Sequence, residues 1–367
     1  MKKILSVVIA LLLLMLSLGL VSCNNVEKAG LYTKDGQFID WEELINKAYV
    51  YVSDGVLKSV KYEFPDGRLV IDKSITQIGS EAFYGKSSLQ LELFIPNTVT
   101  HIGAHAFYLC NNIKKVEFEQ NSSLQVINPY AFYACLLDDI FIPKSVTSIG
   151  YKAFNYAKNT IVVEEGNAVY DSRNNCNAII ETSTNKLIIG CVNTTIPKDI
   201  QIIGEDAFRG SNISNIDFKQ LTQLHTIEGS AFVGCNNITV IELPSSIKKI
   251  DHSFSFCENL QTFIFPEDFQ STGDMYFHPS LNNCYNLKNF VLPKEISQAV
   301  LDSVKTFIDN NHGVYHKLEY VNLFGVSDED VSSYFSPQSS MGSNSKLLRI
   351  YNKNQWTYQN GIPVPTI

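Results

Sequence analysis

Two histidines, His101 and His105, have the four-residue spacing with which one face of a helix can hold a metal ion. Corresponding slots in other repeats of the chain hold Gln, Ser, Thr, Glu, Lys and Asp. Such tolerance indicates a solvated position, so we expect no metal site. The other histidines are scattered and form no zinc-binding signature.

The acidic residues offer no catalytic pair. Asp138 and Asp139 are neighbours in the sequence, as are Glu164 and Glu165, and neighbouring side chains on a strand point to opposite faces. The sequence contains neither a Gly-x-Ser-x-Gly motif nor a phosphate-binding glycine loop. We therefore expect a protein that is not an enzyme and uses no cofactor. A glycan-active enzyme with a site that the sequence does not reveal is the less favoured alternative.

The eight cysteines fall into three groups, of which the first is Cys23 alone. Five others share a slot three residues after a recurring phenylalanine or its counterpart: Cys110, Cys135, Cys235, Cys257 and Cys284. Elsewhere this slot holds Lys, Ala or Ser, which favours buried thiols over bridges between stacked neighbours. The last two, Cys176 and Cys191, face each other if residues 176–191 form a hairpin that pairs Glu181 with Lys186. We expect either a cross-strand disulfide or two free thiols there.

Residues 1–22 have the pattern of a secretory signal peptide. Lys2 and Lys3 precede a long apolar run, which closes with Leu20-Val21-Ser22-Cys23. This ending resembles the lipobox of bacterial lipoproteins. The resemblance implies cleavage before Cys23 and attachment of lipid to its sulfur, which would anchor the mature protein to a membrane outside the cytoplasm. An uncleaved transmembrane anchor and an ordinary secretory signal are the alternatives.

An internal repeat organises the middle of the chain. Ala-Phe pairs, or Ser-Phe in the last copy, recur at one period with a single longer interval: Phe83, Phe107, Phe132, Phe154, Phe208, Phe232 and Phe254. An Ile about five residues before each Phe is often followed by Gly, which would allow a turn conformation. An alternating apolar stretch, which predicts a strand, follows each Phe. Because so short a unit can bury its apolar face only against the next unit, the pattern predicts a solenoid.

The repeat resembles a known family. Its pattern, L-x-x-I-x-I-P-x-S-V-x-x-I-G-x-x-A-F-x-x-C, is similar to the BspA-like leucine-rich repeat of bacterial surface proteins and covers about residues 70–293. Segments near 164–195 resemble an insertion in the same family and suggest a hairpin. The resemblance implies a leucine-rich-repeat solenoid, β-rich with short helical or irregular segments, as an α/β repeat array with terminal caps. It also implies adhesion to host proteins or to other bacteria.

One residue in each predicted strand lies between two inward apolar positions and should point outward. Stacked strands would bring these residues into one column: Phe94, Glu117, Phe141, Val162, Asp217, Glu242, Ile264 and Val291. Outward Phe and Ile indicate a candidate partner surface, although β-rich sheets carry such residues without a binding role.

The flanks of the repeats are predicted as caps and connecting segments. Residues 23–69 should hold a tether and an N-terminal cap, in which Asp40 and Glu43 resemble a capping box that opens a short helix over Trp41, Leu44 and Ile45. The C-terminal expectations are a cap helix and strand over 294–326, a polar linker over 327–346, and a tail over 347–367 whose packing we could not predict.

Composition narrows the function. A hydrophobic fraction of 45% excludes a disordered chain, and 37 acidic against 29 basic residues without a basic cluster argue against nucleic acid as a partner. We expect a monomeric lipoprotein, outside the cytoplasm on the outer membrane or cell surface, that binds host or bacterial surface proteins or glycans. The alternative is an envelope scaffold that binds another protein of the same cell.

Overall fold

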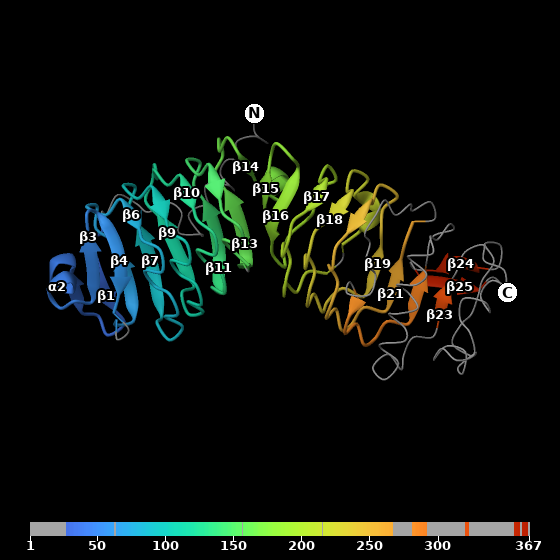
Figure 1. The fold of residues 1–367 in the computed structure, drawn as a ribbon, viewed down its shortest axis with the longest axis horizontal. Helices are drawn as coiled ribbons and strands as arrows, with labels where there is room; N and C mark the ends of the chain where they lie inside the picture. The colour runs from blue at the N-terminus through green and yellow to red at the C-terminus, as the bar shows by residue number, and fades with distance from the viewer. Residues whose placement is uncertain are drawn as a thin grey trace, which may run out of the picture.

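The computed structural model describes residues 27–61, 64–155, 157–214, 216–266, 281–291, 320–322, 356–359 and 362–365. Their coils stack side by side along the long axis of an arched body, with the N-terminal cap at one end (Figure 1). The predicted leucine-rich-repeat solenoid is confirmed, but the described residues hold one α-helix, in the cap, so the repeats are not α/β. The predicted signal peptide, Cys23, the C-terminal cap helix and the polar linker lie outside the described residues.

Strands from successive coils pair in parallel along two sides of the first array. One side has the order β2-β1-β5-β7-β9 followed by the separate pair β11-β13, and we call it the outer sheet: β1 (Gly30–Thr33), β2 (Phe38–Asp40), β5 (Gly67–Val70), β7 (Leu91–Ile95), β9 (Lys115–Phe118), β11 (Leu137–Ile142) and β13 (Ala157–Val163). The second side has the order β12-β10-β8-β6-β4-β3: β3 (Val50–Ser53), β4 (Val56–Val60), β6 (Gln77–Ile78), β8 (His101–Ile102), β10 (Val126–Ile127) and β12 (Ser148–Ile149).

A second array follows with the same plan. Its strands form the sheets β14-β15-β16-β17-β18-β20 and β19-β21-β22-β23: β14 (Tyr170–Asp171), β15 (Ala178–Glu181), β16 (Lys186–Gly190), β17 (Ile202–Ile203), β18 (Thr226–Ile227), β19 (Val240–Glu242), β20 (Lys249–Ile250), β21 (Thr262–Ile264), β22 (Asn289–Val291) and β23 (Tyr320–Asn322). Two 3-10 helices, η1 (Arg173–Asn175) and η2 (Phe218–Gln220), interrupt it. In the tail, β24 (Trp356–Gln359) and β25 (Ile362–Pro365) form an antiparallel hairpin.

The recurring phenylalanines form a stacked core column on the third side of each coil. Phe107 is fully buried, with ring centroids 4.7 Å from Phe83 and 4.9 Å from Phe132. Its backbone N–H donates to the carbonyl of Ala131 in the next coil at 2.7 Å, and Phe83, Phe132, Phe208 and Phe232 donate to the following coil in the same way. The Ala-Phe pair therefore fills the core and joins adjacent coils.

The N-terminal cap closes the first array. Helix α2 (Trp41–Asn46) begins after Asp40, whose carboxylate accepts a hydrogen bond from the Glu43 N–H at 2.8 Å, so the predicted N-cap is confirmed. Trp41 and Leu44 are buried, but Ile45 is 41% exposed, and the expectation that it packs inward was wrong. A helix of about one and a half turns can present only a narrow face to the core.

An internal hairpin, β15–β16, separates the two arrays. Ile179 and Ile189 belong to the core of the first array, whereas Ile180 and Leu187 belong to the core of the second. Both faces of the hairpin are therefore buried, as its nearly continuous apolar sequence requires. The N-terminal hairpin β3–β4 has the same one-residue bulge in its second strand and the same parallel pairing to the next coil, but its Tyr51 is 62% exposed. The internal hairpin thus acts as a second cap that is covered on both sides.

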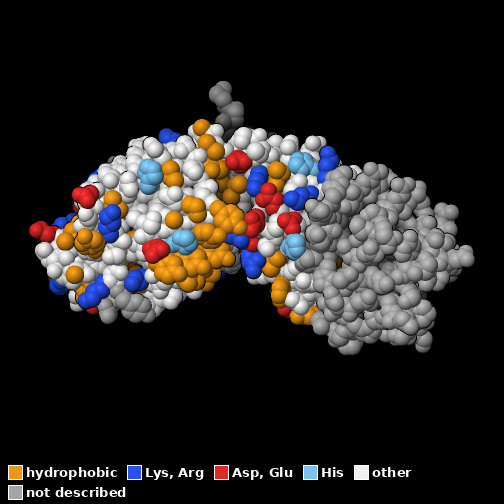
Figure 2. All heavy atoms as spheres, viewed as in Figure 1, with side chains coloured by type: hydrophobic (Ala, Val, Ile, Leu, Met, Phe, Trp, Pro, Cys, Tyr) orange, Lys and Arg blue, Asp and Glu red, His pale blue; other side chains and the backbone are white. Residues whose placement is uncertain are grey.

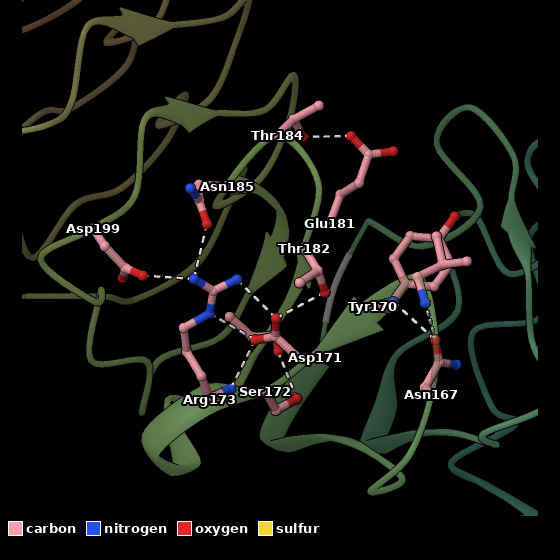
Figure 3. Close-up of polar contacts among 12 residues, drawn as sticks. Asn167, Tyr170, Asp171, Ser172, Arg173, Glu181, Thr182, Thr184, Asn185 and Asp199 are labelled. Carbon is pink, nitrogen blue, oxygen red and sulfur yellow. Dashed lines mark hydrogen bonds and ion pairs between the residues drawn. The ribbon is translucent and has the colours of Figure 1, made fainter.

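Arg173 fastens this internal hairpin to the coil that follows it (Figure 3). Its guanidinium donates twice to the Asp171 carboxylate, at 2.8 and 2.7 Å, and its third nitrogen donates to Asn185 in the hairpin loop and to Asp199 before β17. Partial burial opposes the charge of Asp171, but the hydrogen bonds from Arg173 and Thr182 outweigh it and lower the pKa of that carboxyl.

The five cysteines of the repeat slot are buried free thiols, as the sequence favoured. Each sulfur donates to the carbonyl of the repeat Phe in the preceding coil, for example Cys110 to Phe83 at 2.9 Å and Cys235 to Phe208 at 3.0 Å. Burial raises the pKa of the Cys110 thiol to about 12, so the thiol stays protonated at neutral pH. The column of cysteines therefore links each coil to the coil before it through hydrogen bonds from the thiols to backbone carbonyls.

The turn conformation expected for the Gly after Ile is wrong. Gly79, Gly103, Gly150 and Gly204 have no positive φ. A Cβ at Gly103 would instead lie 2.3 Å from the Ser80 backbone nitrogen, so close approach of adjacent coils is the reason for glycine. Positive φ values occur instead two residues before or after the repeat Phe, mostly at residues other than glycine.

One such position predicts a stabilising substitution. Leu109 has φ 60° and is 39% exposed, whereas the matching slots in other coils are Gly85, Gly210 and Gly234. Because left-handed backbone costs a side chain about 1 kcal/mol, Leu109→Gly should raise the free energy of unfolding by about 0.5–1 kcal/mol in urea titrations. Leu136, 43% exposed without positive φ, is the matched control, and Leu136→Gly should lower stability. Equal shifts in both variants would rule out backbone strain.

Candidate binding surface

The outward column predicted from the sequence exists in the first array. On β7, Phe94 is partly exposed between the buried Leu93 and Ile95, and it pairs with Glu117 on β9. On β11, Phe141 is likewise partly exposed and pairs with Val162 on β13. These four side chains point away from the core on the outer sheet.

A shallow pocket lies in this sheet where the ladder is interrupted between β9 and β11. Its volume is about 40 Å³, and it is lined by Lys115, Val116, Glu117, Asp139, Ile140, Phe141, Thr160 and Val162. Asp139 accepts hydrogen bonds from the backbone and the hydroxyl of Thr160, so its orientation is fixed. The pocket therefore combines an aromatic wall with polar groups held in place, but it is far smaller than a small-molecule site and can take only a small group from a partner's surface.

Arg68, on β5, organises the charges beside this pocket. It forms ion pairs with Glu117 at 2.6 Å and with Glu27 at 2.9 Å, and its guanidinium carbon lies 5.7 Å from the Phe94 ring centroid. Burial opposes the charge of Arg68, but the bonds to Glu117 and Glu27 outweigh it and raise the pKa of the guanidinium. Lys115 pairs with the other oxygen of Glu117 at 2.8 Å. The predicted surface residue Glu117 is thus held between two cations.

In the second array the predicted column does not continue as an exposed surface. Asp217 is exposed, but it directly precedes η2 and does not lie on a strand. Glu242 pairs in register with Ile264, and Ile264 with Val291. Ile264 and Val291 are only 2% and 0% exposed and form a small cluster apart from the main core. Their assignment to an exposed binding surface was therefore wrong, because the outward side of this sheet is covered at both residues.

The structure also corrects the register behind the proposed Cys176–Cys191 bridge. Glu181 pairs with Lys186 as predicted, but a bulge at Ile188 shifts every later pair by one residue. Cys176 consequently lies in the core of the second array and Cys191 in that of the first. Both are free buried thiols in the structure.

The side chains of His101 and His105 do not approach a common site. His101 lies on β8 with its Nδ1 2.9 Å from the Thr100 hydroxyl, whereas the His105 ring stacks on Tyr130 at 5.0 Å. In the described part of the chain, no three or more His, Cys, Asp or Glu side chains are grouped as a metal ion would need. No helix there is both long and apolar enough to cross a membrane.

Sequence reasoning missed a cluster of exposed rings on the third side of the coils. Its residues, which we call the aromatic ladder, are Tyr84, His105, Tyr108, Tyr130, Tyr133 and Tyr151. A signal for it was present, because a Tyr follows the repeat Phe in three successive coils. Arg68 was missed as well, since nothing in its local sequence predicts contact with Phe94.

Comparisons with known proteins agree with this architecture. The family described as "BspA type Leucine rich repeat region" matches residues 67–176 and 179–305. No match was found among curated proteins. Among solved structures, the pneumococcal vaccine antigen PcpA is 18% identical with a TM-score of 0.52, covering 78% of this chain and 79% of its own. A leucine-rich repeat protein from Eubacterium ventriosum is 20% identical with a TM-score of 0.49, covering 67% and 76%. Identities this low concern the fold alone.

Proposed function

Because the chain belongs to the BspA-type leucine-rich repeat family, we propose that it is a lipid-anchored extracytoplasmic protein that binds partner proteins through its outer sheet. The binding residues are Phe94, Glu117, Phe141 and Val162 of the first array, together with Arg68. In this proposal the protein adheres to host or bacterial surfaces and catalyses no reaction.

The observation that carries the proposal is the outward pair Phe94 and Phe141 beside the pocket. Outward phenylalanines add no side chain to the core of the array, and an outward aromatic pair beside a pocket favours a partner surface. Around them, Arg68, Glu117 and Asp139 are oriented by ion-pair and hydrogen-bond partners on the sheet and would give the contact its specificity. Aromatic residues and arginine are the usual centre of protein interfaces.

The proposed anchor is the lipid on Cys23, which precedes the first strand at Gly30 by a short segment. Even fully extended, that segment spans no more than about 25 Å. The N-terminal cap would then lie close to the membrane, and the array would project from it. PcpA, whose structure has the same fold, is described as a vaccine antigen, which supports the display proposed here.

The double substitution Phe94→Ser/Phe141→Ser tests the proposal. Purified wild-type protein should bind at least one immobilised matrix protein, with collagen and laminin as probes, and the variant should bind about 100-fold more weakly because two aromatic anchors are lost. Biolayer interferometry measures both affinities. The matched control is Tyr51→Ser, which removes a ring that is 62% exposed in the N-terminal cap and should leave binding unchanged.

Two outcomes would contradict the proposal. Unchanged affinity of the double variant, with an unchanged unfolding temperature, would remove the outer sheet as the binding site. Wild-type binding to neutral oligosaccharides and to no protein would make the partner a glycan.

A further inference from the structure

The aromatic ladder lies on a different side of the coils from the outer sheet. Its tyrosines directly follow or precede the repeat Phe segments, whose backbones form the third hydrogen-bonded ladder. Tyr84 is 46% exposed and Tyr151 is 50% exposed, and the other members are partly exposed. The core does not need these rings, so a separate explanation is required for their accumulation in adjacent coils.

The rings hold one another in fixed positions. Tyr84 stacks on Tyr108 with centroids 5.2 Å apart and an interplanar angle of 7°, and Tyr108 stacks on Tyr133 at 5.5 Å and 11°. Tyr130 stacks on His105 and meets Tyr133 edge-on at 5.6 Å, which joins the two rows. Little side-chain entropy remains to be lost on binding, so the surface is preorganised.

This stacking also restricts what the ladder can bind. Both faces of Tyr108 are occupied by Tyr84 and Tyr133, so no open ring face remains there for a sugar ring to stack on. Ring edges and phenolic hydroxyls are left for contact with a partner, and these suit the mixed apolar and hydrogen-bonding surface of a protein.

The charged groups next to Tyr151, at one end of the ladder, pair with one another within the protein. At the boundary between the arrays, Lys152 forms ion pairs with Glu205 at 3.1 Å and Asp206 at 2.7 Å, and the Tyr151 hydroxyl donates to Glu205 at 2.7 Å. Figure 2 shows hydrophobic side chains, a class that includes tyrosine, gathered near the lower border of the viewed face, with charged side chains beside them. An apolar aromatic centre with a charged rim is the usual anatomy of a protein interface.

We propose that the aromatic ladder is a second docking surface, which binds a protein partner through an uncharged patch of that partner. The proposal goes beyond the outer-sheet site and does not depend on it. Because the ladder carries no unpaired cation, binding should respond weakly to salt, unlike the binding of a polyanion such as a sulfated glycan.

The test uses full-length protein with Tyr108→Ser/Tyr133→Ser. Collagen, laminin and heparin are the immobilised probes, and interferometry gives the dissociation constants. We expect wild-type protein to bind a matrix protein, the variant to bind it at least about tenfold more weakly, and the wild-type constant to change less than about threefold when salt rises from about 0.1 to 1 M. Tyr51→Ser is again the matched control and should bind as wild type does.

A second variant keeps the test decisive if the serine variant unfolds. Tyr108→Phe/Tyr133→Phe retains both rings and their stacking, so its unfolding temperature should equal that of wild type while loss of the hydroxyls weakens binding about fivefold. Wild-type binding to neither matrix protein, full binding by both tyrosine variants, or binding to heparin that the ladder variants abolish would overturn the proposal. Loss of binding in the outer-sheet variant alone would support the proposed function and refute the ladder.

Discussion

Replacing Phe107 with alanine is expected to lower the free energy of unfolding of the first array by about 3–5 kcal/mol. The ring is fully buried and stacks between Phe83 and Phe132, so its removal leaves a cavity that neighbouring rings, fixed by their own stacking, cannot fill. Urea titration followed by fluorescence or circular dichroism measures the change. Phe38→Ala, at a ring that is 37% exposed, is the control and should cost about 1 kcal/mol or less.

Hydrogen exchange would locate the loss. Because the internal hairpin separates two core clusters, amides of the first array should lose protection in Phe107→Ala while those of the second keep most of theirs. Phe232→Ala, at the equivalent ring of the second array, should show the reverse. Uniform loss of protection across both arrays in either variant would contradict the separation into two cores.

Gly103→Ala is the second substitution with a large expected effect. The new Cβ would lie 2.3 Å from the nitrogen and 2.7 Å from the Cα of Ser80, and backbone atoms of a stacked coil cannot move aside as a flexible side chain can. We expect a loss of about 3 kcal/mol in the free energy of unfolding. At Gly229, in the corresponding turn two coils into the second array, the nearest atom would be 3.8 Å from the new Cβ.

Gly229→Ala is therefore the matched control, with an expected change within about 0.5 kcal/mol. Both substitutions add one methyl group at a glycine without positive φ in the turn before the repeat Phe, and although the two glycines are one position apart in the repeat, the main difference is the space available. Similar losses in the two variants would show that helix or strand propensity, and not coil packing, explains the effect.

The fold could be predicted because repetition multiplies weak signals. One alternating segment is ambiguous, but seven Phe residues at one period require stacked coils, and the shared slot of Cys110 and its counterparts identifies a buried column. The N-cap at Asp40 was predictable for a different reason, since its chemistry is local to three residues.

The errors arose where one residue or one distant contact decides the structure. The bulge at Ile188 adds a single unpaired residue, which no sequence signal marks. Because of this bulge, Cys191 lies in the core of the first array and Cys176 in that of the second. Ile264 and Val291 follow the strand alternation but are buried, because exposure depends on what covers a sheet as well as on its period. The glycines after Ile were predicted to allow a turn conformation, whereas the structure shows that glycine is needed there because adjacent coils approach closely.

The aromatic ladder was not predicted because the period of the sequence marks buried positions. The repeat position of Tyr84, Tyr108 and Tyr133 varies between coils, and in later coils it holds Asn155 and Arg209. Only the stacking geometry shows that the three rings form one surface. A residue that is variable between repeats but uniform over three neighbouring coils is the sequence signal that would have found it.

Adhesion of intact cells tests the central claim most directly, because it requires the anchor, outward display and binding together. Cells that carry the wild-type protein should be retained on a collagen- or laminin-coated surface, and cells that carry Phe94→Ser/Phe141→Ser or Cys23→Ser should be released, as cells without the protein are. Equal retention of cells with and without the wild-type protein would contradict the account.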